Sequence, residues 1–163
     1  MVPFQERERR RVLRVSKFTD YAVVVLSRLE AEGGVQTAPG LALGIGIAEP
    51  TVAKVLKMLA QSGLVEGLRG ARGGYRLLRP LSSLPLSEVI VAVDGPIALT
   101  ACVDGGFGLC EAENTCPVRG RWDPVNAAIR EALSAIMVSE IAAPATNTNR
   151  AQPQAVPMPA LAE

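Results

Sequence analysis

The chain has 163 residues, of which 48% are hydrophobic and 4% aromatic, so one domain with a modest core of small aliphatic side chains is expected. Its net charge is +1, and it contains three cysteines and no histidine. No stretch approaches the roughly 20 apolar residues of a membrane span, and none has a signal-peptide pattern, so a cytoplasmic protein with reduced thiols and no membrane contact is expected.

The first half of the chain begins with a polar extension that precedes two predicted helices. Residues 1–12 are rich in arginine, have no periodicity and are expected to be disordered. Ser16 is a suitable N-cap for the first helix, and Gly33 stops it. Thr37 is placed to cap a second, short helix around residues 41–43, because a proline and a glycine follow in its first turn.

A third predicted helix and a hairpin complete this region. The helix begins at Pro50 and Gly63 ends it. Its buried face is expected to consist of residues spaced three and four apart, namely Val52, Val55, Leu56 and Leu59. Residues 64–65 and 75–78 are predicted to be two short strands joined by a glycine-rich tip. This order of elements is typical of a winged helix-turn-helix domain, which we assign to residues 13–80.

The second half of the chain is predicted to contain two helices on either side of a cysteine-bearing loop. A linker helix over residues 86–93 and the loop together make up residues 81–121. A long helix in residues 122–142 follows, with one apolar stripe formed by Val125, Ile129, Leu133, Ile136 and Met137. Winged helix-turn-helix proteins commonly bind DNA as dimers, so this stripe is expected to join two copies, the alternative being packing on its own domain. Residues 143–163, rich in proline and alanine, are expected to be a disordered tail.

Basic residues gather on the third helix and the hairpin. Residues 50–80 carry six Lys/Arg and one acidic residue, whereas residues 81–163 have four arginines and nine acids. Thr51, Lys54 and Lys57 would reach a major groove from the exposed side of the helix. Arg69 and Arg72 at the glycine-rich tip would reach a narrow minor groove. The alternatives are a solvated lysine face and a plain surface hairpin, but the two features together favour double-stranded promoter DNA as a partner.

The three cysteines, Cys102, Cys110 and Cys116, lie on one segment with seven and five residues between them. Structural zinc sites normally use cysteine pairs about two to four residues apart, often with histidine, and this chain has neither. Three thiolates on a glycine-rich loop can instead surround a larger object such as an iron–sulfur cluster. Unliganded thiols, or a redox disulfide with one spare cysteine, are the alternatives. An enzyme is not expected, because no constellation of nucleophile and base and no phosphate-binding loop is evident.

The sequence also carries a specific combination of motifs: Phe18-Thr19-Asp20-Tyr21-Ala22, the helix sequence Pro50 to Lys57, the hairpin sequence Gly63 to Leu77, Gly95 to Thr100, and the cysteine segment that ends in Cys116-Pro117-Val118-Arg119. This combination covers residues 13–141, about four-fifths of the chain. It resembles the bacterial winged-helix repressor family that includes IscR and NsrR, and within that family the branch that regulates the SUF iron–sulfur assembly system.

The resemblance implies a homodimer that binds a two-iron or four-iron cluster through the three cysteines and regulates promoters, most simply as a repressor, according to cluster state. It places Thr51, Lys54 and Lys57 on the recognition helix and Arg69 on the wing. IscR-like members use a histidine as the fourth ligand, which this chain lacks, whereas NsrR-like members use an aspartate in the first helix that corresponds to Asp20. Without Asp20, the remaining candidates are an external thiol, Asp104, Glu111 and Glu113.

Two departures from the family pattern limit what the resemblance carries over. IscR-like recognition helices have a glutamate where this chain has Ala53, so their DNA sequence preference does not transfer. Family members begin close to the position of Leu13, so we hypothesise that translation starts near Val12 and that residues 1–11 are absent from the native protein. The intact mass of the natively expressed protein tests this hypothesis, and a mass that includes residues 1–11 would refute it.

Two rival functions fit the same residues. A cluster-carrying assembly or electron-transfer protein would use the basic hairpin to dock an acidic partner. It would show no steep dependence of DNA affinity on salt, whereas a regulator would, because its cations release counterions from DNA. A DNA-binding thiol switch without a cluster would instead respond reversibly to peroxide in its metal-free form.

Overall fold

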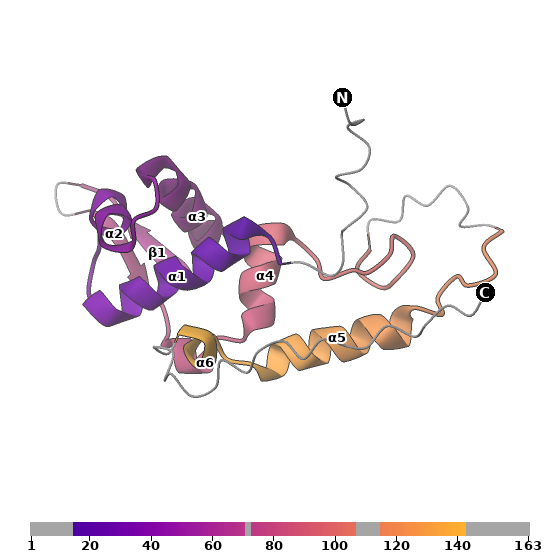
Figure 1. The fold of residues 1–163 in the computed structure, drawn as a ribbon. Coiled ribbons are helices and arrows are strands. Elements are labelled where there is room, and N and C mark those ends of the chain that lie inside the picture. Colours follow the sequence, from indigo (N-terminus) through magenta and orange to yellow (C-terminus); the bar gives the residue numbers. More distant parts are fainter. Residues whose placement is uncertain (1–14, 71–72, 107–114, 143–163) are drawn as a thin grey trace, which may run out of the picture.

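The computed structural model describes residues 15–70, 73–106 and 115–142, which form a set of helices and one two-stranded antiparallel sheet (Figure 1). The elements in chain order are α1 Lys17–Glu32, α2 Ala38–Ile45, α3 Glu49–Gln61, β1 Val65–Leu68, β2 Gly74–Leu77, the 3-10 turn η2 Leu81–Ser83, α4 Leu86–Asp94, α5 Asp123–Ala135 and α6 Val138–Ala142. This arrangement confirms the predicted class, mainly helical with a small hairpin wing.

The predicted ends of the first three helices are present. The Ser16 hydroxyl accepts the N–H of Thr19 at 3.1 Å, and the Thr37 hydroxyl accepts the N–H of Gly40 at 3.2 Å. Each contact satisfies a backbone donor that the first turn of a helix leaves without an internal partner. Gly63 follows α3 with a φ of 71°, a left-handed conformation that glycine adopts at low cost.

One hydrophobic core joins the helices. The buried side of α3 lies against α1 and α2, and the core continues into α4, η2 and α6. Its fully buried larger members include Leu26, Leu29, Leu41, Leu56, Leu59, Leu81, Leu84, Val25, Val52, Val55, Val65 and Val89. Aliphatic side chains dominate this list, as the low aromatic content predicts.

The wing is fixed to the rest of the domain through its second strand. Val65 pairs with Leu77 and Leu68 pairs with Gly74, so the strands extend closer to the tip than predicted. The N–H of Tyr75 donates to the carbonyl of Gln36 at 2.7 Å, which ties β2 to the α1–α2 connection. A Cβ atom on Gly74 would lie 2.5 Å from that carbonyl oxygen, so the close approach requires glycine.

The predicted single helix in residues 122–142 is instead two helices, α5 and α6, with a break at Ile136 and Met137. The carbonyl of Ile136 accepts the N–H of Leu86, and the N–H of Val138 donates to the carbonyl of Leu84, both at 2.8 Å. This backbone pairing with the segment before α4 replaces helical hydrogen bonds. As a result α6 packs on α1, while α5 extends away from the α1–α3 unit and packs on α4 (Figure 1).

Several predictions concern residues outside the described ranges. These are the extension of residues 1–12, the tail of residues 143–163, Arg72 and Cys110. Within the described ranges, no single helix is long and apolar enough to cross a membrane.

Candidate nucleic-acid interface and cysteine loop

The exposed side of α3 carries the residues predicted to contact DNA. Lys54 and Lys57 are exposed and Thr51 is half-buried. Their spacing of three residues places them on one side of the helix, opposite the fully buried Val55 and Leu56. The structure therefore brings the three predicted α3 residues to one surface.

Residues of α3 and of the wing line one open cavity of about 410 Å³. Lys57 lines it from the helix, and Arg69 and Tyr75 line it from the hairpin. Two cations from different elements therefore border one groove, an arrangement suited to binding a polyanion.

Acidic side chains engage two further arginines, one in the hairpin and one just after it. Arg76 Nε donates to Glu66 across the strands at 2.7 Å, and Arg79 pairs with Glu88 of α4. Among the described residues, Lys54, Lys57 and Arg69 take part in no ion pair. The surface that carries unpaired cations is thus smaller than the sequence indicates. Among the described residues, it comprises the exposed side of α3 and Arg69 near the wing tip.

The first turn of α1 contacts both α3 and the end of α4. The ammonium of Lys54 lies 4.4 Å from the centroid of the Phe18 ring, a cation–π contact. The next residue, Thr19, is fully buried and donates its hydroxyl to Asp94 at 2.8 Å. Asp94 ends α4, immediately before the segment that carries the cysteines. The sequence gives no local signal of this contact, because its partners are 75 residues apart.

Cys102 and Cys116 are both reduced and half-buried. The Cys102 sulfur lies 3.5 Å from the hydroxyl oxygen of Thr100, and the carbonyl of Cys116 accepts the N–H of Arg119 at 3.3 Å. Within the part of the chain that the structure describes, no three His, Cys, Asp or Glu side chains come together as a metal site. The predicted ligands Cys102, Cys116 and Asp20 are therefore not assembled in one copy.

Asp20 is exposed on α1 and borders a cavity of about 420 Å³. Residues of α1, α2 and α6 line this cavity, among them Ile45 and Ile141, and Cys102 and Cys116 do not. Asp104, a further candidate ligand, is exposed and lies 3.7 Å from the guanidinium of Arg130. Glu111 and Glu113 fall outside the described residues.

Sequence reasoning missed the residues that connect the cysteine segment to α5. Asn126 is buried and hydrogen-bonds the backbone of residues 97–99, and Asp123 accepts the N–H of Asp104 at 3.1 Å. A polar side chain inside the otherwise alanine-rich and aliphatic first turns of α5 was the available signal. The apolar stripe predicted for this region does not include Asn126, so helical periodicity gave no sign of its burial.

Comparison with known proteins agrees with this architecture. A family model described as "Rrf2: Iron-dependent Transcriptional regulator" matches residues 15–144. The chain is 35% identical over 124 residues to the protein aau3 of Rhizobium meliloti (strain 1021), covering 76% of each. It is 28% identical over 131 residues to the HTH-type transcriptional regulator IscR of Escherichia coli O1:K1 / APEC, covering 79% of this chain and 80% of that one.

A solved structure shows the same fold. CymR, described as the global cysteine regulator of B. subtilis, aligns with a TM-score of 0.59 at 22% identity, covering 80% of this chain and 97% of CymR. This likeness confirms the winged-helix fold of the described residues. Because the family model spans most of the sequence, from the start of α1 to the end of α6, the chain belongs to the Rrf2 family of transcriptional regulators.

Proposed function

We propose that this protein is a cytoplasmic, homodimeric repressor that binds promoter DNA through α3 and the wing. In this proposal the DNA affinity depends on an iron–sulfur cluster held by the cysteine segment, and the target genes encode the SUF cluster assembly system. The observation that carries the proposal is the groove between α3 and the hairpin, bordered by Lys57 and Arg69. Membership of a transcriptional regulator family makes DNA the polyanion that fits it.

The DNA contacts proposed are Thr51, Lys54 and Lys57 on α3 and Arg69 and Arg72 on the wing. A helix of this type enters the major groove while the wing follows the phosphate backbone or the adjacent minor groove. Ion pairs already engage Arg76 and Arg79, so these two arginines are not included.

The dimer contact proposed is the outer surface of α5. This helix packs on α4 and also bonds the backbone of residues 97–104. Val125 of this helix is 45% exposed, and Trp122 and Ile136, which flank its two ends, are 44% and 38% exposed, so three large apolar side chains face solvent in one copy. A second copy would bury them, and a dimer would present two recognition helices to two half-sites.

The cluster ligands proposed are Cys102, Cys110 and Cys116, with Asp20 as the fourth. The donor chemistry fits, because cysteine thiolates are the ligands that iron–sulfur clusters take, and the two described thiols are reduced and accessible. IscR, an iron–sulfur regulator by the resemblance stated above, is a relative over most of the chain. Because Asp20 does not group with the cysteines in one copy, it would join the site from the second copy of the dimer.

The contacts of the first turn of α1 support a coupling route. Ordering of the cysteine segment would shift or fix Asp94, which accepts the buried Thr19 hydroxyl. The adjacent Phe18 contacts Lys54 of the recognition helix, so the same turn of α1 reaches the DNA-binding surface. A coupling free energy of about 1–3 kcal/mol would change operator affinity roughly 5- to 150-fold.

A DNA-binding thiol switch is the second candidate. It is favoured by the lack of an assembled metal site among the described residues, which leaves Cys102 and Cys116 as reduced, half-buried thiols. In this case peroxide would change the DNA affinity of the metal-free protein and a thiol reductant would restore it.

The first test combines cluster content with DNA binding. Protein purified without oxygen is expected to be coloured and to contain iron and acid-labile sulfide, and Cys110→Ala is expected to be colourless. DNA ligands selected from a random-sequence library then give the salt dependence of the affinity. If the three described cations contact phosphate in each subunit of a dimer, about six contacts predict a slope of log K against log salt near −5.

The outcomes separate the proposal from its rivals. A colourless protein with a steep salt slope would favour the thiol switch, whereas a coloured protein without a steep slope would favour an assembly or electron-transfer role. A protein with neither property would contradict all three.

The role of Asp20 has its own test. Asp20→Ala is expected to dimerise normally and to lose its cluster several-fold faster on dilution, because one ligand is removed. Asp20→Cys supplies a thiolate at the same position and is expected to retain the cluster with an altered visible spectrum. The matched control is Glu32→Ala, which removes an exposed carboxylate at the other end of α1. Equal cluster lifetimes in all four proteins would remove Asp20 from the site.

A further inference from the structure

Residues 97–106, which include Cys102, form a folded segment that bonds α5 and is called the Cys102 arm below. It contains a turn in which the N–H of Gly106 donates to the carbonyl of Val103 at 2.8 Å. A Cβ atom on Gly106 would lie 2.6 Å from the carbonyl oxygen of Ala101, so the chain folds back on itself too closely for any other residue. Val103 is buried, which orients the turn towards the protein. These contacts give the arm a defined shape.

Asn126 of α5 bonds the arm through both ends of its side-chain amide. Its Oδ1 accepts the N–H of Leu99 at 3.0 Å, and its Nδ2 donates to the carbonyl of Ile97 at 3.2 Å. Asn126 is 2% exposed, so an unpaired amide there would be costly, and only an amide supplies a donor and an acceptor in this geometry. Asn126 thus binds the backbone of the arm specifically, at a point three residues before Cys102.

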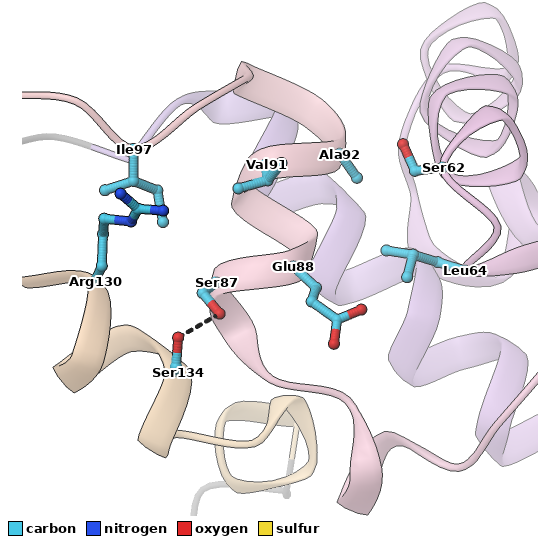
Figure 2. Close-up of a pocket in the computed structure, with 9 residues that line it drawn as sticks. All are labelled: Ser62, Leu64, Ser87, Glu88, Val91, Ala92, Ile97, Arg130 and Ser134. Carbon is cyan, nitrogen blue, oxygen red and sulfur yellow. Dashed lines mark hydrogen bonds between the residues drawn. The ribbon is translucent and has the colours of Figure 1, made fainter. Parts of the chain in front are cut away.

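Two contacts along α5 extend this attachment. Asp123 accepts the N–H of Asp104, two residues after Cys102, at 3.1 Å. One helical turn beyond Asn126, Arg130 lines a cavity together with Ile97 (Figure 2). Its exposed ion pair with Asp104 adds little stability. The arm is thus bonded to α5 on both sides of Cys102.

We propose that Asn126 is the positioning residue of Cys102, and that through it the state of the Cys102 thiol is communicated to α5. The inference rests on the proposed function and names the regulatory connection within the same site. A bond formed or lost at Cys102 would displace the short Cys102 arm. The arm is bonded to the buried Asn126 on α5, the helix proposed to join two copies. Signals would then reach the dimer contact as well as the first turn of α1.

The test uses full-length, reduced, metal-free protein, so that it does not depend on cluster binding. Asn126→Ala is expected to speed hydrogen exchange at the Leu99 amide about 5- to 100-fold, because that N–H loses its acceptor. Alkylation of Cys102 by iodoacetamide is expected to speed up several-fold, while alkylation of Cys116 in the same sample stays unchanged. Asn126→Asp keeps the acceptor for Leu99 and loses the donor to Ile97, so it is expected to retain Leu99 protection with intermediate Cys102 reactivity.

Ser134→Ala is the matched control, since it removes the 2.9 Å hydrogen bond between α5 and Ser87 of α4 and leaves the arm untouched (Figure 2). It is expected to behave as wild type at both cysteines. Equal acceleration at Cys102 and Cys116, or no change at Leu99 in folded Asn126→Ala, would overturn the proposal. If that variant does not fold, an unprotected Leu99 amide in the wild type would overturn it equally. Failure to bind a cluster would count against the proposed function and leave these readouts unaffected.

Discussion

Alanine at both Lys57 and Arg69 is expected to weaken binding to selected operator DNA by about 100-fold or more. Each charge-assisted contact contributes roughly 1.5–3 kcal/mol, so two lost contacts amount to roughly 3–6 kcal/mol. The two side chains border one groove from α3 and from the hairpin, and no described acid pairs with either of them. Because phosphate contacts release counterions, the salt slope is expected to fall by about two per subunit. Fluorescence anisotropy at several salt concentrations measures both quantities.

Arg76→Ala provides the matched control for this prediction. Arg76 lies on the same hairpin and carries the same charge, but Glu66 already engages it across the strands at 2.7 Å. Its replacement is expected to change DNA affinity by less than about threefold, because exposed ion pairs of this kind contribute little. If Arg76→Ala weakened DNA affinity as much as alanine at both Lys57 and Arg69, net charge rather than the groove would determine binding.

Leu56→Ala is expected to lower the free energy of unfolding by about 2–5 kcal/mol, which is a large part of the roughly 5–15 kcal/mol that stabilises a typical domain. Leu56 is fully buried on the inner side of α3, within the core shared with α1. The change leaves a cavity that close-packed neighbours fill only in part. Urea unfolding followed by circular dichroism at one fixed protein concentration measures the loss, because the stability of a dimer depends on concentration.

Leu43→Ala is the corresponding control. Leu43 is 89% exposed on α2, so its replacement is expected to change the free energy of unfolding by less than about 0.5 kcal/mol. A similar loss from both leucine variants would mean that the outer side of α2 is covered in solution, in contrast to its exposure in one copy. A small loss from Leu56→Ala alone would contradict the buried position of α3.

Local chemistry in the sequence was sufficient for the N-terminal fold. The hydroxyls of Ser16 and Thr37 cap α1 and α2 as predicted, and Gly63 ends α3, because each signal acts within three or four residues of its partner. Residues three and four apart on α3 produced the buried face that was predicted, which also fixed Lys54 and Lys57 on the opposite side. The ligand set of Cys102, Cys110, Cys116 and Asp20 remains a prediction.

What only the tertiary structure decided depends on partners far apart in the chain. The break between α5 and α6 follows from backbone bonds between residues 84–86 and 136–138, which helical periodicity cannot reveal. The pairing of Arg79 with Glu88 and the burial of Asn126 against residues 97–99 have the same origin. The sequence by itself therefore determined the helices and the hairpin of the N-terminal region and the charges that they carry. Long-range packing determined which of those charges remain unpaired, and it determined that the cysteine segment is bonded to α5. Both outcomes depend on residues far apart in the chain that come together only on folding.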